Sequence, residues 1–281
     1  MPSKKIKVAS CQFPVSGSIT RNSRHICDFL KQARRKKADL VHFSECALTG
    51  YAGFDLQSTD QIDWQLLRRE TEKILDFARQ YQLWIILGST HQLTRHLPHN
   101  SLYLINPRGK IADRYDKRFC TPGDLDNYSP GNRFVTFRVN GVKCALLICF
   151  DLRFPELYLE LKRQKVHCIF QSFYNARQVG PSIHNFIMRQ TMQCRAATNY
   201  FWISMTNSSA RYAPYPSCFI RPDGKITQQL PLNRPGIMTN TIDLNKTYYD
   251  LMATFRNAAL KGALNSGLAI HDPRSQNTTC F

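Results

Sequence analysis

The chain has 281 residues, of which 43% are hydrophobic and 21% are charged. This balance is typical of a globular protein and excludes a disordered chain, a collagen and a coiled coil. The longest unbroken apolar run, residues 144–150, is far shorter than the ~20 residues of a membrane-spanning helix. Residues 1–7 lack the apolar core of a secretory signal, so we expect a cytoplasmic protein with no membrane partner.

The charge is strongly positive, with 38 Lys and Arg against 20 Asp and Glu, a formal net charge of +18. Such a surplus can indicate nucleic-acid binding. However, the basic residues are scattered, with short clusters at 34–37 and 68–69, and neither an RNA-binding motif nor zinc-finger spacing accompanies them. We therefore expect no nucleic-acid partner, and interpret the charge as a solvated surface or as attraction of anionic substrates.

Apolar runs in chain order predict strands at 5–13, 40–43, 84–88, 101–105, 134–139, 142–148, 166–172, 200–205, 217–220 and 236–242. Helical spacing of apolar residues predicts helices over 21–36, 65–81 and 183–199, and Pro155 predicts the start of a further short helix. Turns are predicted at 106–110, at Asn140-Gly141 and at Asp223-Gly224. This order indicates an α/β fold with one mixed sheet or two sheets, covered by helices.

No linker rich in Pro, Gly or Ser divides the chain, so we expect one domain over residues 1–242. Residues 243–281 lack strong periodicity and are expected to form a C-terminal extension that packs on the domain or on a partner subunit. The ten cysteines include no C-x-x-C pair, and several lie in apolar runs, as is typical of reduced thiols in a core. His91, His96 and His99 stand close together without further ligands at a recognisable spacing, so no metal or other cofactor is expected.

Two reactive side chains stand at the ends of buried strands, where α/β proteins usually build their sites. Glu45 follows the strand at 40–43, and its partial desolvation should raise its pKa and suit it to act as a general base. Cys149 ends the strand at 142–148, just before the helix that Pro155 opens, which is the setting of an exposed nucleophile. A nearby helix N-terminus should lower the pKa of this thiol and offer N–H groups to an oxyanion. Taken singly, the glutamate could equally cap a helix or form a salt bridge, and the cysteine could fill the core.

A third segment, Tyr115-Asp116-Lys117-Arg118-Phe119, places a lysine beyond a strand, where a lone lysine is usually surface charge. Together, Glu45 before Thr49-Gly50-Tyr51, Lys117, and Cys149 in C-F-D-L-R-F-P-E resemble the carbon–nitrogen hydrolase (nitrilase) superfamily. The spacings are 72 residues from Glu45 to Lys117 and 32 from Lys117 to Cys149. The resemblance spans residues 5–242 and includes Asn100-Ser101, 107–110, 129–131 and Arg195-Ala196.

The resemblance implies a four-layer α-β-β-α sandwich that assembles as a homodimer or a larger homo-oligomer. It implies that Cys149 attacks a small amide to form a thioester and release ammonia, while Glu45 takes the thiol proton and later activates water. Lys117 and the backbone N–H of Phe150 would stabilise the oxyanion. The family places a second acidic residue, usually Glu, seven positions before the Gly of S-P-G; here that position holds Asp124, one methylene shorter. Thr198 also departs from the pattern, because a Glu is usual there.

The residues after the cysteine, Phe150-Asp151, resemble the amidase-like branch more than true nitrilases, which tend to have Trp-Glu. Arginine pairs bidentately with carboxylates, so a carboxylate-bearing amide or an N-carbamoyl amino acid would suit Arg153 and Arg177. Candidate substrate-binding residues are Tyr51, Phe150, Arg153, Tyr174, Asn175 and Arg177. Arg153 could equally tie the active-site helix to the sheet, and both tyrosines could be core aromatics. A catalytically weak relative that acts as a scaffold is the rival interpretation.

Overall fold

The computed structural model describes residues 4–268 and 270–279, which form two compact units, one ending at Tyr249 and the other beginning at Asp250. The domain boundary expected after residue 242 therefore lies a few residues before the division between the two units, which falls after Tyr249. The smaller unit holds two short helices, α6 (Arg256–Leu260) and α7 (Pro273–Gln276). Among the described residues, none of the helices is both long and apolar enough to cross a membrane.

The larger unit contains two six-stranded mixed sheets of matching design. Each has three parallel strands flanked by antiparallel ones. The first sheet has the order β12 (Gly236–Asp243), β1 (Lys5–Gln12), β2 (Leu40–His42), β3 (Trp84–His91), β4 (His99–Ile105) and β5 (Ile111–Asp116). The second has the order β11 (Ile226–Gln229), β10 (Cys218–Ile220), β9 (Trp202–Thr206), β8 (Cys168–Ser172), β7 (Val142–Ile148) and β6 (Thr136–Val139).

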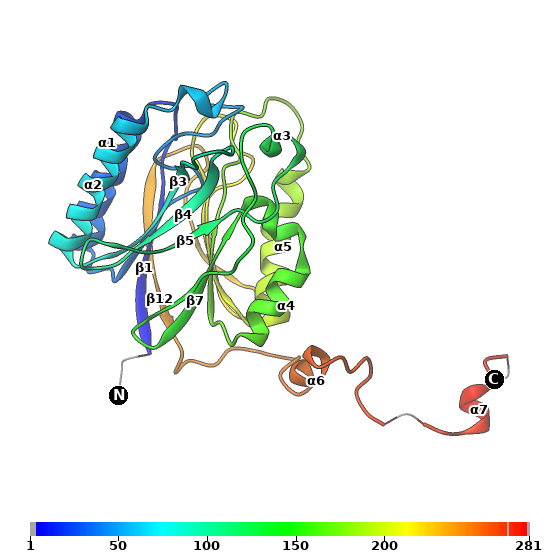
Figure 1. Cartoon of the computed structure of the whole chain (residues 1–281). Coiled ribbons are helices and arrows are strands. Elements are labelled where there is room, and N and C mark those ends of the chain that lie inside the picture. Colours follow the sequence, from blue (N-terminus) through cyan, green and yellow to red (C-terminus); the bar gives the residue numbers. More distant parts are fainter. Residues whose placement is uncertain (1–3, 269, 280–281) are drawn as a thin grey trace. The chain divides into compact units, whose positions relative to one another are not determined.

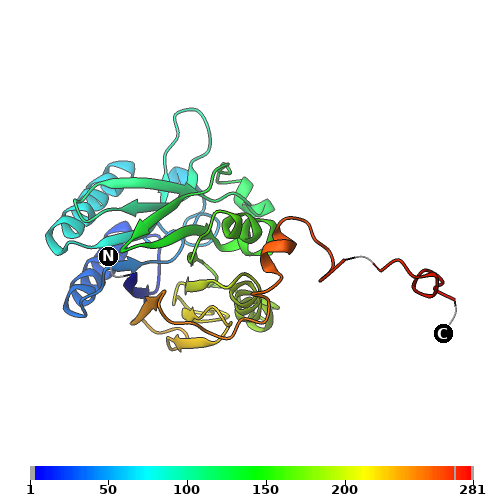
Figure 2. The ribbon, with the colours of Figure 1, turned by 90° about the horizontal axis from the view of Figure 1, so that it is seen from below.

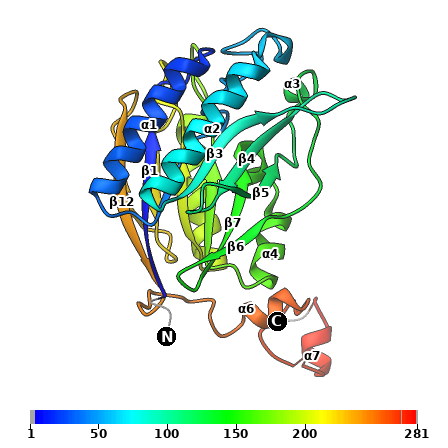
Figure 3. The ribbon, with the colours of Figure 1, turned by 60° about the vertical axis from the view of Figure 1, so that its left-hand side comes forward.

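Helices cover the outer face of each sheet, which gives the four layers α-β-β-α of the larger unit (Figure 1). The first sheet is covered by α1 (Ile19–Arg35) and α2 (Trp64–Tyr81), which lie side by side in Figure 3. The second sheet is covered by α4 (Pro155–Arg163) and α5 (His184–Asn199). The predicted α/β sandwich is thus confirmed, and the two predicted N-terminal helices match α1 and α2.

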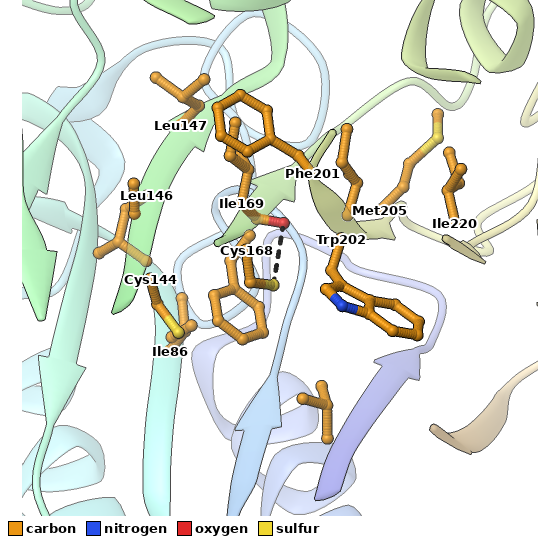
Figure 4. Packing of buried hydrophobic residues seen from close by; sticks show 14 of the residues in the cluster. Ile86, Cys144, Leu146, Leu147, Cys168, Ile169, Phe201, Trp202, Met205 and Ile220 are labelled. Carbon is orange, nitrogen blue, oxygen red and sulfur yellow. Dashed lines mark hydrogen bonds between the residues drawn. The ribbon is translucent and has the colours of Figure 1, made fainter. Parts of the chain in front are cut away.

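Alternation along the strands explains the layering. In β3, Ile85 and Leu87 face the helices α1 and α2, whereas Ile86 between them faces the second sheet. Figure 4 shows Ile86 in the inter-sheet region with Cys144 of β7 and Cys168 of β8. All three of these side chains are fully buried, so both sheets share one apolar interior.

Of the short elements that were not predicted, three lie in the larger unit and carry no apolar run. These are β5 and β11, which are edge strands, and α3 (Pro122–Leu125). The residues of β11 are half-buried or exposed throughout, and only the last two residues of β5 are buried. An edge strand with so little apolar burial leaves no hydrophobic pattern for the sequence to display.

Candidate active site

Four chain segments meet where strands of both sheets end. Glu45 follows β2, Lys117 follows β5, Cys149 follows β7 and Tyr174 follows β8. Because β2 in one sheet and β7 and β8 in the other run toward the same end of the sandwich, residues far apart in sequence come together there (Figure 1). Glu45, Lys117, Asp124 and Cys149, all predicted to be catalytic, lie in this one region.

The buried Lys117 ammonium lies between two buried carboxylates. Its Nζ is 2.8 Å from Oε1 of Glu45 and 2.8 Å from Oδ2 of Asp124. A third contact, at 3.3 Å, joins Nζ to the hydroxyl of Tyr51. Burial alone would lower the pKa of Lys117, but the charges of Glu45, Tyr51, Cys149 and Asp124 together raise it well above its usual range. The ammonium form of Lys117 is therefore favoured.

The carboxylate of Glu45 accepts hydrogen bonds from three donors, one of which is Lys117. Its Oε1 also accepts a hydrogen bond of 2.8 Å from Nδ2 of Asn100 on β4, and its Oε2 accepts one of 2.7 Å from the backbone N–H of Tyr174. Burial raises the pKa of Glu45, and the nearby Asp124 charge adds to the rise, although Lys117 and Asn100 oppose it. A raised pKa for Glu45 was expected from the sequence. It suits a carboxyl group that exchanges protons near neutral pH.

The backbone of β3 passes close to the Glu45 segment because residue 88 is a glycine. A Cβ at Gly88 would lie 2.0 Å from the carbonyl oxygen of Ser44, a distance no side chain could occupy. The Gly88 carbonyl in turn accepts a hydrogen bond of 2.9 Å from the N–H of Leu48. Gly88 therefore fixes the loop that carries Glu45 against the first sheet.

Asp124 is fixed by the short helix α3. Its Oδ2 accepts a hydrogen bond of 2.8 Å from the N–H of Thr121, whose hydroxyl caps the N–H of Asp124 in return, so the two residues form a capping box. The other carboxylate oxygen accepts from the Tyr51 hydroxyl. Burial alone would raise the pKa of Asp124, but Lys117, Tyr51 and Thr121 outweigh it and lower the pKa. The shorter aspartate thus reaches the lysine because α3 carries it there.

Cys149 begins a 3₁₀ helix (Cys149–Arg153) directly after β7, with a left-handed φ of 37°. A non-glycine residue at positive φ in a strand-to-helix turn is costly and is often found at functional sites. Burial raises the pKa of its thiol well above the usual range, and the Glu45 carboxyl raises it further, while Lys117 lowers it. The expected acidification of this thiol was therefore wrong, because desolvation and the neighbouring Glu45 carboxyl outweigh the effect of Lys117.

Asp151 holds this turn in place. One of its carboxylate oxygens accepts hydrogen bonds of 2.7 Å from the Tyr115 hydroxyl and 2.9 Å from the N–H of Ile148, and the other accepts one of 3.0 Å from the N–H of Phe119. These contacts join the end of β7 to β5 and to the segment that follows Lys117. Neither Asp151 nor Asn100 was predicted as a site residue, because a single buried carboxylate or amide gives no distinctive sequence pattern.

A cavity of about 510 Å³ opens above these groups. Its lining includes Lys117, Asp124 and Cys149 together with five of the six predicted substrate-binding residues: Tyr51, Phe150, Arg153, Tyr174 and Asn175. The rings of Tyr51 and Tyr174 stack with centroids 4.9 Å apart and form one wall. The cavity size is in the range of small-molecule sites.

Arg177, the sixth predicted residue, is directed elsewhere. Its Nε lies 2.6 Å from Oδ1 of Asp55, its Nη2 donates to the carbonyl oxygen of Val15, and it is absent from the cavity lining. His184, at the start of α5, does line the cavity, and its buried Nδ1 has no hydrogen-bond partner among the described residues. Sequence reasoning missed His184 because its role depends on how α5 meets the turn after Cys149.

No group of three or more His, Cys, Asp or Glu side chains that could hold a metal ion occurs within residues 4–268 and 270–279. His91 and His99 make separate contacts, the first to the Tyr103 hydroxyl at 2.8 Å and the second to the carbonyl oxygen of Ser129 at 2.7 Å. The groups that meet at Cys149 are therefore its thiol, the Lys117 ammonium and the carboxylates of Glu45 and Asp124.

Comparisons with known proteins agree with this arrangement. The chain matches the family model for carbon-nitrogen hydrolases over residues 7–249. It is 31% identical over 221 residues to a hydrolase in the agr operon of Staphylococcus lugdunensis, covering 75% of this chain and 89% of that protein. It is 23% identical over 256 residues to an omega-amidase from Homo sapiens, covering 85% and 89%. The crystal structure of an amidase from Nesterenkonia sp. matches with a TM-score of 0.75 at 18% identity, covering 86% of this chain and 92% of that one.

The family match spans almost the whole larger unit, including the segments that carry Glu45, Lys117 and Cys149. The curated relatives include amidases, and the matching solved structure has the same fold. The chain is thus a hydrolase of carbon–nitrogen bonds other than peptide bonds, and it belongs to the carbon–nitrogen hydrolase family.

Proposed function

We propose that this enzyme hydrolyses a small amide through a thioester on Cys149, with release of ammonia. The observation that carries the proposal is that Cys149 and the Lys117 ammonium line one small-molecule cavity, with the buried Glu45 carboxylate 2.8 Å from the ammonium. A thiol nucleophile, a carboxyl group raised in pKa and a fixed cation are the groups that acyl transfer requires.

In the first half of the reaction, the Cys149 sulfur forms a bond to the amide carbon while Glu45 takes the thiol proton. The negative charge that develops on the amide oxygen is stabilised by Lys117 and by the backbone N–H of Phe150. The C–N bond then breaks, and Glu45 returns the proton to the departing nitrogen, which leaves as ammonia. The raised pKa of Glu45 makes both transfers feasible near neutral pH.

In the second half, Glu45 takes a proton from a water molecule as the water oxygen attacks the thioester carbon. The resulting oxyanion occupies the same place near Lys117, and its collapse breaks the C–S bond. The proton on Glu45 passes to the sulfur, which restores the thiol, and the carboxylic acid leaves. Asp124 remains ionised, as its lowered pKa indicates, and acts as a positioning residue for Lys117.

We further propose that the substrate carries a carboxylate, held by Arg153. Arg153 lines the cavity four residues after the nucleophile and forms no ion pair within the described part of the chain. His184 lines the same cavity, and burial together with the Arg153 charge lowers its pKa, which favours the neutral imidazole. A guanidinium and an unpartnered imidazole at one end of a cavity are suited to a carboxylate.

The proposal is tested by measuring ammonia release from ω-amides of dicarboxylic acids, N-carbamoyl amino acids, aliphatic amides and nitriles. We expect turnover of an ω-amide, and we expect Arg153→Ala to raise its KM at least tenfold while changing that of a neutral amide by less than threefold. Equal effects on charged and neutral amides would contradict the carboxylate subsite. Turnover of N-carbamoyl substrates alone would favour the carbamoyl alternative, and an absence of turnover together with unreactive Cys149 would favour a scaffold.

We also propose that the chain forms a homodimer or a larger homo-oligomer in the cytoplasm. Support for assembly comes from apolar side chains exposed on the outer helices, with Phe186 of α5 69% exposed, Ile183 just before α5 61% exposed and Leu159 of α4 41% exposed. Reduced thiols buried in the core suit a reducing compartment. Light scattering on the wild type and on Phe186→Asp tests the assembly, since a monomer in both would contradict it. Docking of residues 243–281 on the domain or a partner stays a prediction.

A further inference from the structure

A second cavity, of about 490 Å³, lies at the opposite end of the larger unit from Cys149. The cavity opens where β8 and β9 begin and β12 ends. Cys149 follows the last residue of β7, and β7 runs parallel to β8, so the thiol lies at the other end of these strands. A strand of seven residues such as β7 is roughly 20 Å long. Figure 2 views the molecule from this end, at which β1 also begins, and Figure 1 places α3 at the other end.

The cavity is lined by basic side chains from five separate segments and by no described Asp or Glu. These side chains are Lys4, Arg138, Lys162, His167 and Lys246. They come from the residue before β1, from β6, from the last turn of α4, from the residue before β8 and from the segment after β12. Like charges gathered in a concave surface raise the local potential more than the same charges spread over a convex one.

Three of these cations have no carboxylate counter-ion among the described residues. Lys4, Arg138 and Lys246 form no ion pair with any residue that the structure describes. Two carboxylates of neighbouring elements are already engaged, because Asp243 lies 3.1 Å from Nζ of Lys5 and Asp223 pairs with Arg221. The cavity therefore has cations available for an anion.

His167 adds a neutral donor. Its Nδ1 accepts a hydrogen bond of 3.0 Å from the backbone N–H of Lys143, so in the neutral ring Nε2 carries the hydrogen. Burial, and then the charges of Arg138, Lys162, Lys143 and Lys4, lower the pKa of His167, which is an independent sign that these cations surround the ring. The Lys143 ammonium is not counted as a ligand group, because it donates to the carbonyl oxygen of Gln164 at 2.7 Å.

We propose that this cavity binds a small phosphate ester with two or more negative charges. Three cations without ion-pair partners and an imidazole N–H match a group with several anionic oxygens better than a single carboxylate. Val166, Trp202 and Leu244 supply an apolar wall for the organic part, and the volume suits a ligand of that size. Because the cavity lies about a strand length from the thiol, the ligand is an effector and not the amide substrate.

The test is calorimetric titration of the full chain at 50 mM salt with ATP, tripolyphosphate and uncharged adenosine. We expect ATP and tripolyphosphate to bind and adenosine to leave no signal. Arg138→Ala should weaken ATP binding about tenfold, the loss expected for one charge-assisted contact. Arg138 is exposed and its side chain donates to the carbonyl oxygen of Gly141 at 3.3 Å, so the variant should melt at the wild-type temperature and hydrolyse amides at the wild-type basal rate.

Arg108→Ala is the matched control. Arg108 is an exposed arginine in the turn between β4 and β5, outside the cavity, and its removal changes the net charge by the same amount. An equal weakening in both variants would show general attraction to a protein of net charge +18 and would overturn the proposal. It would also be overturned if neither ATP nor tripolyphosphate bound. None of these outcomes bears on the Cys149 site.

Discussion

Replacing Glu45 by Gln gives the sharpest test of the proposed chemistry. Oε1 of Glu45 accepts from both Lys117 and Asn100, and Oε2 accepts from the N–H of Tyr174. A glutamine has one oxygen and one NH₂ group, so in either orientation its NH₂ faces a donor. The substitution therefore removes the proton acceptor for Cys149. It also places the NH₂ group of the glutamine against another hydrogen-bond donor.

The two effects have different magnitudes and different readouts. Loss of a general base lowers kcat by about 10²–10⁴, which corresponds to about 3–5 kcal/mol in the barrier. The mismatched donors should lower the free energy of unfolding by about 1–3 kcal/mol. We expect a folded enzyme with a slightly lower melting temperature and a rate at pH 7 reduced at least a hundredfold.

The pH dependence separates base catalysis from a merely structural effect. Because the pKa of Cys149 is raised, few thiols ionise without help at pH 7. The residual activity of Glu45→Gln should then rise about tenfold per pH unit between pH 7 and 9, as the thiolate forms without a base, while the wild-type rate stays level. A variant rate within threefold of wild type at pH 7, or a flat profile, would refute the reasoning.

The remaining predictions concern the nucleophile, the acid limb and the interior. Cys149→Ala should abolish hydrolysis, whereas Cys194→Ala, at an exposed thiol, should leave the rate unchanged; hydrolysis by the first variant would show that another group attacks. Wild-type kcat/KM should fall as the pH drops through the raised pKa of Glu45, and Asn100→Ala should move this fall to higher pH, since it removes a hydrogen bond that lowers that pKa; an unmoved profile would assign the acid limb to another group. Burial lowers the pKa of His42 from 6.5 to about 3, so below pH 6.5 protons bind the unfolded chain but not the folded one. Urea unfolding should show about 2 kcal/mol of stability lost between pH 7 and 5, a loss absent in His42→Asn, and equal losses in both proteins would contradict this linkage.

The sequence could predict the central strands and the long helices because each buries a continuous apolar face. It could also predict where Glu45 and Cys149 stand, since both follow strands that are apolar throughout. The position of Lys117 followed only from the resemblance to a family, because the strand before it, β5, is mostly polar and lies at an edge. The strand β11 was not predicted for the same reason, because its residues are also mostly polar.

The details that sequence could not predict all depend on which groups become neighbours. The raised pKa of Cys149 follows from a carboxyl group contributed by the other sheet. The diversion of Arg177 follows from Asp55, a residue 122 positions away, and the contact of Asn100 with Glu45 joins residues 55 positions apart. No local pattern encodes such distances, so these features required the folded structure.

The site centre explains how a thiol with a raised pKa can still be activated. At rest the centre holds one ammonium, on Lys117, and two carboxylates, on Glu45 and Asp124, which together carry one net negative charge. Transfer of the Cys149 proton to Glu45 moves that charge from oxygen to sulfur and leaves the total unchanged. The Lys117 charge acts on both Glu45 and Cys149, so the ammonium need not move for the transfer to occur. Asp124 keeps the lysine in place, and its own lowered pKa prevents it from competing for the proton. The two carboxylates, with pKa values shifted in opposite directions, therefore have different roles: Glu45 transfers the proton and Asp124 positions Lys117.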